Sequence, residues 1–225
     1  MKDNFELIRE KLKFGNGYFY FIQLLRRAKD EKLGPNGEPN PLYHGNMHSR
    51  SLRNYYIRDM KTLDLYENEI KSICDTQDCR AYIRLNRRSD EKVTKILASR
   101  LMEYLVSGNY GKPEKALTSA IGLACAEPRK SKTWILDVDE EYMRPDITAT
   151  IWTFLNKELG NILVKDVFVV PTPHGCHFIT PPFNKNKYAE YWNTVASDPK
   201  RQSLFPVPAD PPGIQPDNPT ILYAP

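Results

Sequence analysis

Residues 134–139 read WILDVD, and this short stretch decides how the second half of the chain is interpreted. Its apolar, tryptophan-led start predicts a buried strand that ends in two carboxylates, Asp137 and Asp139. Side chains two residues apart in a strand share one face of a sheet, so both carboxylates are expected on the same side. Like charges held that close favour a cation between them, and an oxygen-preferring ion such as Mg²⁺ or Mn²⁺ fits. The alternative is structural: one aspartate caps the next helix and the other is solvated.

Composition describes a soluble globular protein. The 225 residues are 40% hydrophobic and 27% charged, and no apolar run approaches the length of a membrane-spanning helix. The N-terminal residues 1–13 contain acids and lack the apolar core of a signal peptide, so we expect a cytoplasmic protein with no membrane partner. The four cysteines have no spacing that predicts a disulfide framework, which agrees with that compartment.

Charge is distributed unevenly along the chain. Residues 1–133 carry a balance of +8, and residues 134–225 carry a balance of −4. A basic half joined to an acidic half with paired aspartates suits an enzyme that holds a polyanion together with a metal ion.

Hydrophobic periodicity and turn residues predict an α/β (α+β) fold in which helices flank a mixed central sheet. We expect one domain over residues 1–225, with a basic N-terminal extension (1–79) and a catalytic core (80–222). Strands are predicted at 18–25, 52–58, 80–88, 134–139, 162–170, 176–180 and 220–223, the last as an edge strand. Helices are predicted at 3–12, 61–74, after Ser89, after Pro113, at 147–159 with Asp146 as its cap, and at 187–195. Residues 33–50 are expected to form a loop, and the proline-rich residues 203–219 are expected to be irregular.

Two further polar clusters follow the WILDVD strand. The first is PTPHGCHFIT at 171–180, where Gly175 allows close backbone approach to a ligand and His174 and His177 flank it. A histidine at the start of a strand, such as His177, more often has a structural role. A Gly-x-His hairpin beside a strand with paired carboxylates instead favours a functional site. The second cluster is Pro216-Asp217-Asn218-Pro219, for which a simple turn is the structural alternative.

Taken together, these motifs resemble the archaeo-eukaryotic primase (primase-polymerase) superfamily. Motif I of that family carries two metal-binding aspartates and matches Asp137-Val138-Asp139. Motif II is a small residue, any residue and a histidine, and matches Gly175-Cys176-His177. Motif III is an apolar residue followed by Asp, and is most simply matched by Asp217. Residues 81–88, AYIRLNRR, are similar in layout to a strand that opens the family's core. The resemblance covers residues 80–222 and is to a small phage-type or mobile-element member, which would work in a bacterial host's cytoplasm.

The chain departs from the family pattern in two places. Gly175 stands where serine is frequent, and Pro216 replaces the apolar residue before the motif III aspartate, which leaves Asp210 as a second candidate for the third metal ligand. No segment resembles the family's helical or zinc-bearing accessory domain, so a helicase or another replication protein is an expected partner.

The resemblance implies a metal-dependent nucleotidyltransferase that adds NTPs or dNTPs to a primer or to a template-bound start. Asp137, Asp139 and Asp217 would hold Mg²⁺ or Mn²⁺, and His177 would contact the phosphates of the incoming nucleotide. Further contacts to the nucleotide or its phosphates are expected from Gly175, His174, Arg84, Arg87 and Arg88. Contacts to single-stranded or template nucleic acid are expected from Arg26, Arg27 and Lys29.

Two other functions remain open from the sequence. The first is a protein that has kept this fold and binds nucleic acid without catalysis, which the departures in motifs II and III favour. The second is a metal-dependent nuclease that uses the same carboxylates.

Overall fold

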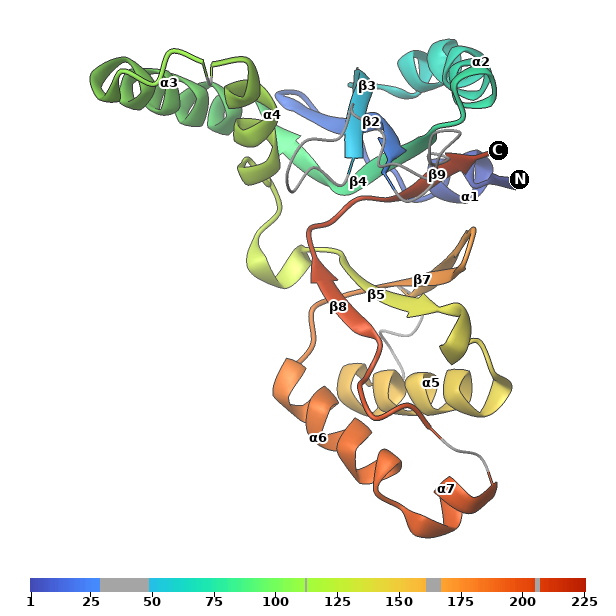
Figure 1. Ribbon diagram of the computed structural model, residues 1–225. Coiled ribbons are helices and arrows are strands. Elements are labelled where there is room, and N and C mark those ends of the chain that lie inside the picture. Colours follow the sequence, from blue (N-terminus) through green and yellow to red (C-terminus); the bar gives the residue numbers. More distant parts are fainter. Residues whose placement is uncertain (29–48, 112, 161–166, 205–206) are drawn as a thin grey trace, which may run out of the picture. The chain divides into compact units, whose positions relative to one another are not determined.

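The computed structural model describes residues 1–28, 49–111, 113–160, 167–204 and 207–225 (Figure 1). The chain forms two compact units: unit 1 contains Met1–Glu127 and Pro219–Pro225, and unit 2 contains Pro128–Asn218. The sequence predicts a single domain with an internal boundary near residue 80, whereas the structure divides the chain at residue 127. The reason is strand pairing, because the strand that begins at Arg80 pairs with the preceding part of the chain and therefore cannot begin a separate core.

Unit 1 is built on a five-stranded sheet with the order β1-β9-β4-β2-β3. The pairs in this sheet are antiparallel. Its strands are β1 (Lys2–Asp3), β2 (Tyr18–Arg27), β3 (Ser49–Ile57), β4 (Arg80–Ser89) and β9 (Thr220–Ala224). The prediction of an edge strand near the C-terminus is wrong, since β9 pairs with β4 on one side and with the short β1 on the other.

Helices cover both faces of this sheet. The helices of unit 1 are α1 (Phe5–Arg9), α2 (Met60–Gln77), α3 (Asp90–Ser107) and α4 (Pro113–Leu123). Two adjacent tyrosines of β3 show which helices cover which face, because successive residues of a strand point to opposite faces of the sheet. Tyr56 packs on Phe19 and Phe21, which belong to the core cluster of α3 and α4, whereas Tyr55 packs on Tyr66 of α2.

Helix α3 begins as the sequence predicts but packs less completely. The Ser89 side chain accepts a hydrogen bond from the backbone N–H of Lys92, which caps the helix. Val93 is buried and Ile96 and Leu97 pack against the same cluster, but Leu105 is exposed. The apolar stripe therefore serves as core over its first half alone.

Unit 2 contains a four-stranded antiparallel sheet with the order β6-β7-β5-β8. Its strands are β5 (Trp134–Asp139), β6 (Phe168–Thr172), β7 (Gly175–Thr180) and β8 (Gly213–Pro216). Residues 162–166 of the strand predicted at 162–170 lie outside the described residues. The two-residue turn Pro173-His174 joins β6 to β7. Strand β8 lies in the segment predicted to be irregular. The sequence pattern does not predict this strand because it is short and flanked by prolines.

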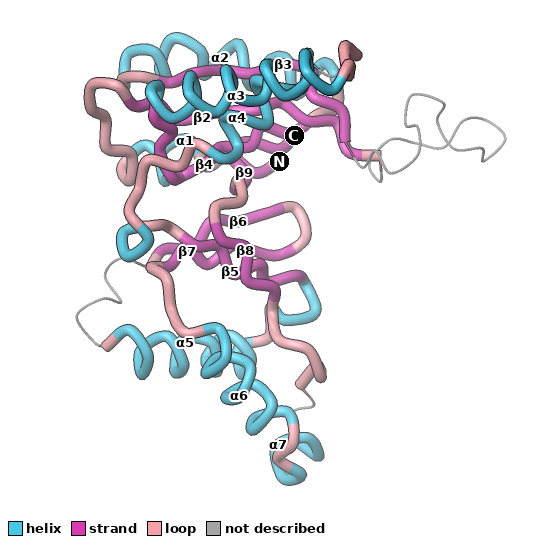
Figure 2. Tube along the Cα trace, turned by 90° about the vertical axis from the view of Figure 1, so that its left-hand side faces the viewer, coloured by secondary structure: helices cyan, strands magenta, loops and turns pink. Residues whose placement is uncertain are grey.

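The helices α5 (Pro145–Leu159), α6 (Lys185–Ala196) and α7 (Pro199–Leu204) complete unit 2. Leu136 and Val138 of β5 and Phe178 of β7 share a core cluster with residues of α5 and α6, such as Phe154 and Trp192. Both helices lie on the same side of the strands (Figure 2). The residues of β5 that alternate with Leu136 and Val138 therefore form the opposite face of the sheet.

The start of α5 differs from the prediction. Its N-cap is Arg144, and Pro145 occupies the first turn, so Asp146 lies inside the helix rather than at its cap. Proline suits this position because it needs no hydrogen-bond partner for a backbone N–H. Asp146 still stabilises the helix start through its negative charge, and it pairs with Arg144 at 2.8 Å. Gly160 ends the helix, as predicted.

The predicted α+β class is confirmed. The strands are divided between two antiparallel sheets rather than gathered in one mixed sheet. Within the described residues, no helix is both long enough and apolar enough to cross a membrane.

Candidate functional site

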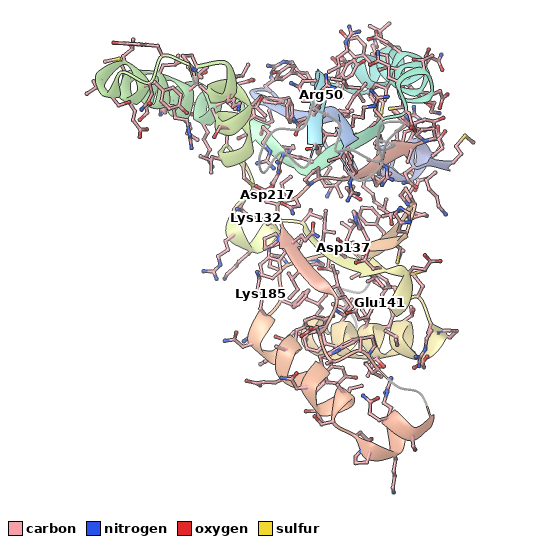
Figure 3. The ribbon with its side chains drawn as sticks, viewed as in Figure 1. Arg50, Lys132, Asp137, Glu141, Lys185 and Asp217 are labelled. Carbon is pink, nitrogen blue, oxygen red and sulfur yellow. The ribbon has the colours of Figure 1, made fainter. Side chains whose placement is uncertain are left out.

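The two sequence motifs of the second half lie side by side on adjacent strands. In the antiparallel pairing of β5 with β7, Asp137 is opposite His177 and Asp139 is opposite Gly175. Directly opposed residues share a face, so both carboxylates and the imidazole lie on the sheet face that α5 and α6 do not cover. Residues that are almost 40 positions apart in sequence thus form one polar cluster, and Figure 3 labels Asp137 within it.

The carboxylate of Asp137 is held from two strands. Nε2 of His177 lies 3.3 Å from its Oδ1, and Nε2 of Gln215 on β8 donates a hydrogen bond of 2.7 Å to its Oδ2. Asn218 in turn donates to Oε1 of Gln215 at 2.9 Å. This chain of contacts fixes the orientation of Asp137 at the centre of the cluster.

The local backbone geometry requires a glycine at position 175. Its φ of 151° lies in a region that side chains other than glycine rarely adopt. A Cβ atom at this position would collide with the carbonyl oxygen of Val138 and lie 3.0 Å from Cα of Asp139. The departure from serine at motif II therefore has a physical reason: β7 crosses too close to β5 for a side chain.

Negative charge gathers at the end of β5 that carries Asp139. Burial raises the pKa of Tyr142, and the carboxylates of Glu141, Asp210 and Asp139 raise it further. On the helix-covered face, burial and then the charge of Asp137 raise the pKa of the Cys176 thiol to about 11. The free Cys176 thiol is therefore protonated near neutral pH.

Asp217 does not reach the paired aspartates, contrary to the prediction. Strand β8 runs antiparallel to β5, with Gly213 opposite Asp137 and Pro216 opposite Trp134. Asp217 follows Pro216 in a turn with a φ of 63°, beyond the start of β5. At the rise of a strand it lies about four residues, or roughly 13 Å, from Asp137. Figure 3 labels both residues.

Asp210, the second candidate for this role, lies toward the other end of β5. Its backbone oxygen accepts a hydrogen bond of 3.0 Å from the hydroxyl of Tyr142. Its charge therefore adds to that of Asp139 and Glu141, but its side chain is exposed.

Sequence reasoning missed Gln215. Gln215 lies on the short strand β8, and the surrounding prolines hid that strand from sequence reasoning.

The arginines predicted to grip phosphates belong to unit 1 and differ in their surroundings. Arg88 is fully buried and donates to the carbonyl oxygen of Gly122 at 3.3 Å, which does not support a phosphate contact. Arg87 is paired with Glu127 at 2.6 Å and its guanidinium lies over the ring of Tyr18. Arg84 lines a surface pocket, described below.

The remaining predicted residues are placed as follows. Arg26 and Arg27 end β2, where Arg26 is paired with Arg50 of β3. Lys29 lies outside the described residues. His174 is exposed in the turn between β6 and β7.

The fit of a divalent ion rests on two oxygen donors. In the part of the chain that the structure describes, no group of three or more His, Cys, Asp or Glu side chains is arranged to hold a metal. Asp137 and Asp139 nevertheless offer carboxylates on one face, beside the negative charge around Tyr142. Hard oxygen ligands of this kind suit Mg²⁺ or Mn²⁺, which keep several waters in their coordination shell.

Comparison of the chain with protein-family models, curated proteins and solved structures gave no significant match.

Proposed function

We propose that this protein is a metal-dependent nucleotidyltransferase of the primase-polymerase type. One observation carries the proposal: the β5–β7 register sets the Asp-x-Asp motif and the Gly-x-His motif side by side. These motifs are matched to the family by sequence, and their adjacency is what a shared catalytic site requires. The substrates would be nucleoside triphosphates and a template or single-stranded nucleic acid. The protein would act in the cytoplasm, and its partner would be a helicase or another replication protein.

Each residue of the cluster has a role that its contacts support. Asp137 and Asp139 would hold the divalent ion, which when bound would neutralise phosphate charge and favour attack by a 3′-hydroxyl. Gln215 orients the Asp137 carboxylate through its 2.7 Å hydrogen bond. His177, 3.3 Å from Asp137, would contact a phosphate of the nucleotide beside the ion.

A second candidate is a protein of this fold that binds nucleic acid without catalysis. The observation in its favour is Gln215, an amide where the motif III pattern calls for a carboxylate. Without that charge, ion binding is weaker, because affinity for such ions rises with the number of charged ligands.

A nuclease would use the same two carboxylates, and degradation of labelled DNA with Mn²⁺ separates it from a polymerase.

The experiment is Mn²⁺-dependent binding of a nucleoside triphosphate, followed by primer extension on a DNA template with NTPs and dNTPs. The variant is Asp137→Asn with Asp139→Asn, and the control is Glu190→Gln, an exposed carboxylate on α6 of the same unit. We expect the double variant to lose metal-dependent binding and synthesis while its circular dichroism spectrum and melting temperature resemble those of the wild type.

Two results would contradict the proposal. Synthesis by the double variant at the wild-type rate would remove the carboxylates from the reaction. Failure of the wild type to bind nucleotide or extend a primer, with binding of single-stranded DNA intact, would favour the non-catalytic function.

A further inference from the structure

A surface pocket of about 610 Å³ lies within unit 1. It is bordered by strands β3 and β4 and by helices α3 and α4. Arg84 is paired with Phe21 across β4 and β2, so it shares the sheet face on which α3 and α4 pack. The pocket thus opens beside the core cluster of those two helices.

The residues around the pocket carry positive charge and hydroxyl groups. Three cations come from three different elements: Arg84 from β4, Arg100 from α3 and Lys115 from α4. Hydroxyl groups come from Ser51, Thr118 and Ser119. Among the residues that the structure describes, those that line the pocket include neither a carboxylate nor an aromatic ring.

Helix α4 has two distinct faces at this point. Ala116, Ala120 and Ile121 are buried in unit 1. Lys115, Thr118, Ser119 and Gly122 line the pocket, at the spacing of a single helix face. The polar stripe is therefore directed at the pocket by the same packing that fixes the helix on the sheet.

We infer that this pocket binds the phosphate groups of a nucleic-acid strand. Guanidinium groups match phosphate geometry through paired hydrogen bonds, and hydroxyls donate to the remaining oxygens. None of the described residues that line the pocket is aromatic, so they offer a base no stacking surface. We therefore expect contacts to the nucleic-acid backbone alone. Such contacts bind without sequence preference and weaken as salt rises.

This inference does not depend on the proposed catalytic function, because the pocket lies wholly within unit 1 and contains no expected metal ligand. Binding of a strand to it should persist when divalent ions are removed with EDTA. It should also persist in the Asp137→Asn/Asp139→Asn variant.

The test is fluorescence anisotropy of labelled single-stranded DNA and RNA in EDTA over a series of salt concentrations. The first variant is Arg100→Gln with Lys115→Gln, and its control is Lys61→Gln, an exposed cation on α2. We expect the double variant to bind every sequence at least about tenfold more weakly near 0.1 M salt. The slope of log affinity against log salt should fall by about 1.4, which is about 0.7 for each cation removed on a single strand.

Gly122 allows a second test that removes no native side chain. A Cβ built on Gly122 meets no atom within 4 Å, so the backbone surroundings accept a side chain at this position. Gly122→Glu adds a negative charge to the pocket and is expected to weaken binding, whereas Gly122→Gln, of the same size, is expected to leave it nearly unchanged.

Three results would overturn the inference. The first is that the Arg100→Gln/Lys115→Gln variant and Gly122→Glu both bind with the wild-type affinity. The second is that the wild type binds no strand in EDTA. The third is that an equal concentration of a free nucleoside triphosphate displaces the strand. The last result would assign the pocket to nucleotides instead.

Discussion

Nε2 of Gln215 donates a hydrogen bond of 2.7 Å to Oδ2 of Asp137, from a strand that no sequence pattern revealed. The amide donor satisfies one oxygen of the carboxylate from the β8 side. Under the proposed function, this contact would influence how strongly Asp137 binds a divalent ion.

Replacing the amide with an acid tests this relation. Gln215→Glu places a second carboxylate beside Asp137, and like charges at that distance repel unless a cation lies between them. We expect the melting temperature of Gln215→Glu to fall below that of the wild type in EDTA and to rise more steeply with Mn²⁺. Calorimetry should show Mn²⁺ binding about tenfold tighter than in the wild type. Equal stabilisation of both proteins by Mn²⁺ would show that no ion binds next to Asp137.

Gly175 is predicted to be essential to the pairing of β5 with β7. Gly175→Ala would bring its methyl group against the backbone of Val138 and Asp139. We expect the free energy of unfolding in urea to fall by about 2 kcal/mol or more. Neither strand can move away from the methyl group without breaking the backbone hydrogen bonds between β5 and β7. Gly213→Ala on β8 is the control, because its Cβ would meet no atom within 4 Å. Similar losses in the two variants would refute this account of the close approach.

His177 is predicted to act on the nucleotide. His177→Ala should raise the nucleotide KM about tenfold if the imidazole donates to a charged phosphate. His174→Ala, in the exposed hairpin turn, is the comparison variant and should have the smaller effect. Steady-state kinetics of primer extension measures both. If the KM of His177→Ala matches that of the wild type, the residue serves to position Asp137 and not to bind phosphate.

Glu67 of α2 provides a test of stability against pH in unit 1. Burial alone would raise the pKa of Glu67, but hydrogen bonds from Lys71 and Arg9, both at 2.6 Å, hold it below its ordinary value. A lowered pKa means that the carboxylate stabilises the fold above about pH 4.3 and ceases to do so as pH falls through the lowered value.

Glu67→Gln is therefore expected to lose about 1 kcal/mol in the free energy of unfolding at pH 7 and pH 5. The difference should shrink as pH falls below about 4.3. Glu91→Gln, which removes an exposed partner of Lys95 in the first turn of α3, is the control and should have the smaller effect. A difference between Glu67→Gln and the wild type that stays constant down to pH 3.5 would contradict the assigned interaction.

Much of the local structure follows from nearby residues. The caps at Ser89 and Gly160, the strand WILDVD and the hairpin around His174 are all local features, so their positions could be predicted. The α+β class follows from the same local signals. The alternation of side chains in β5 likewise predicts that Asp137 and Asp139 share a face.

The pairing of strands could not be predicted in this way, because register depends on contacts between distant segments. It set His177 opposite Asp137, moved Asp217 beyond the start of β5 and brought Gln215 to the carboxylate. It also joined β2 and β3 to β4, which shifted the division of the chain to residue 127. Residue types and local spacing by themselves determined most of the elements, although not β8, and the chemistry that they carry. The tertiary structure decided which of those groups meet, because burial of the faces of two sheets selects one register from several that the sequence allows.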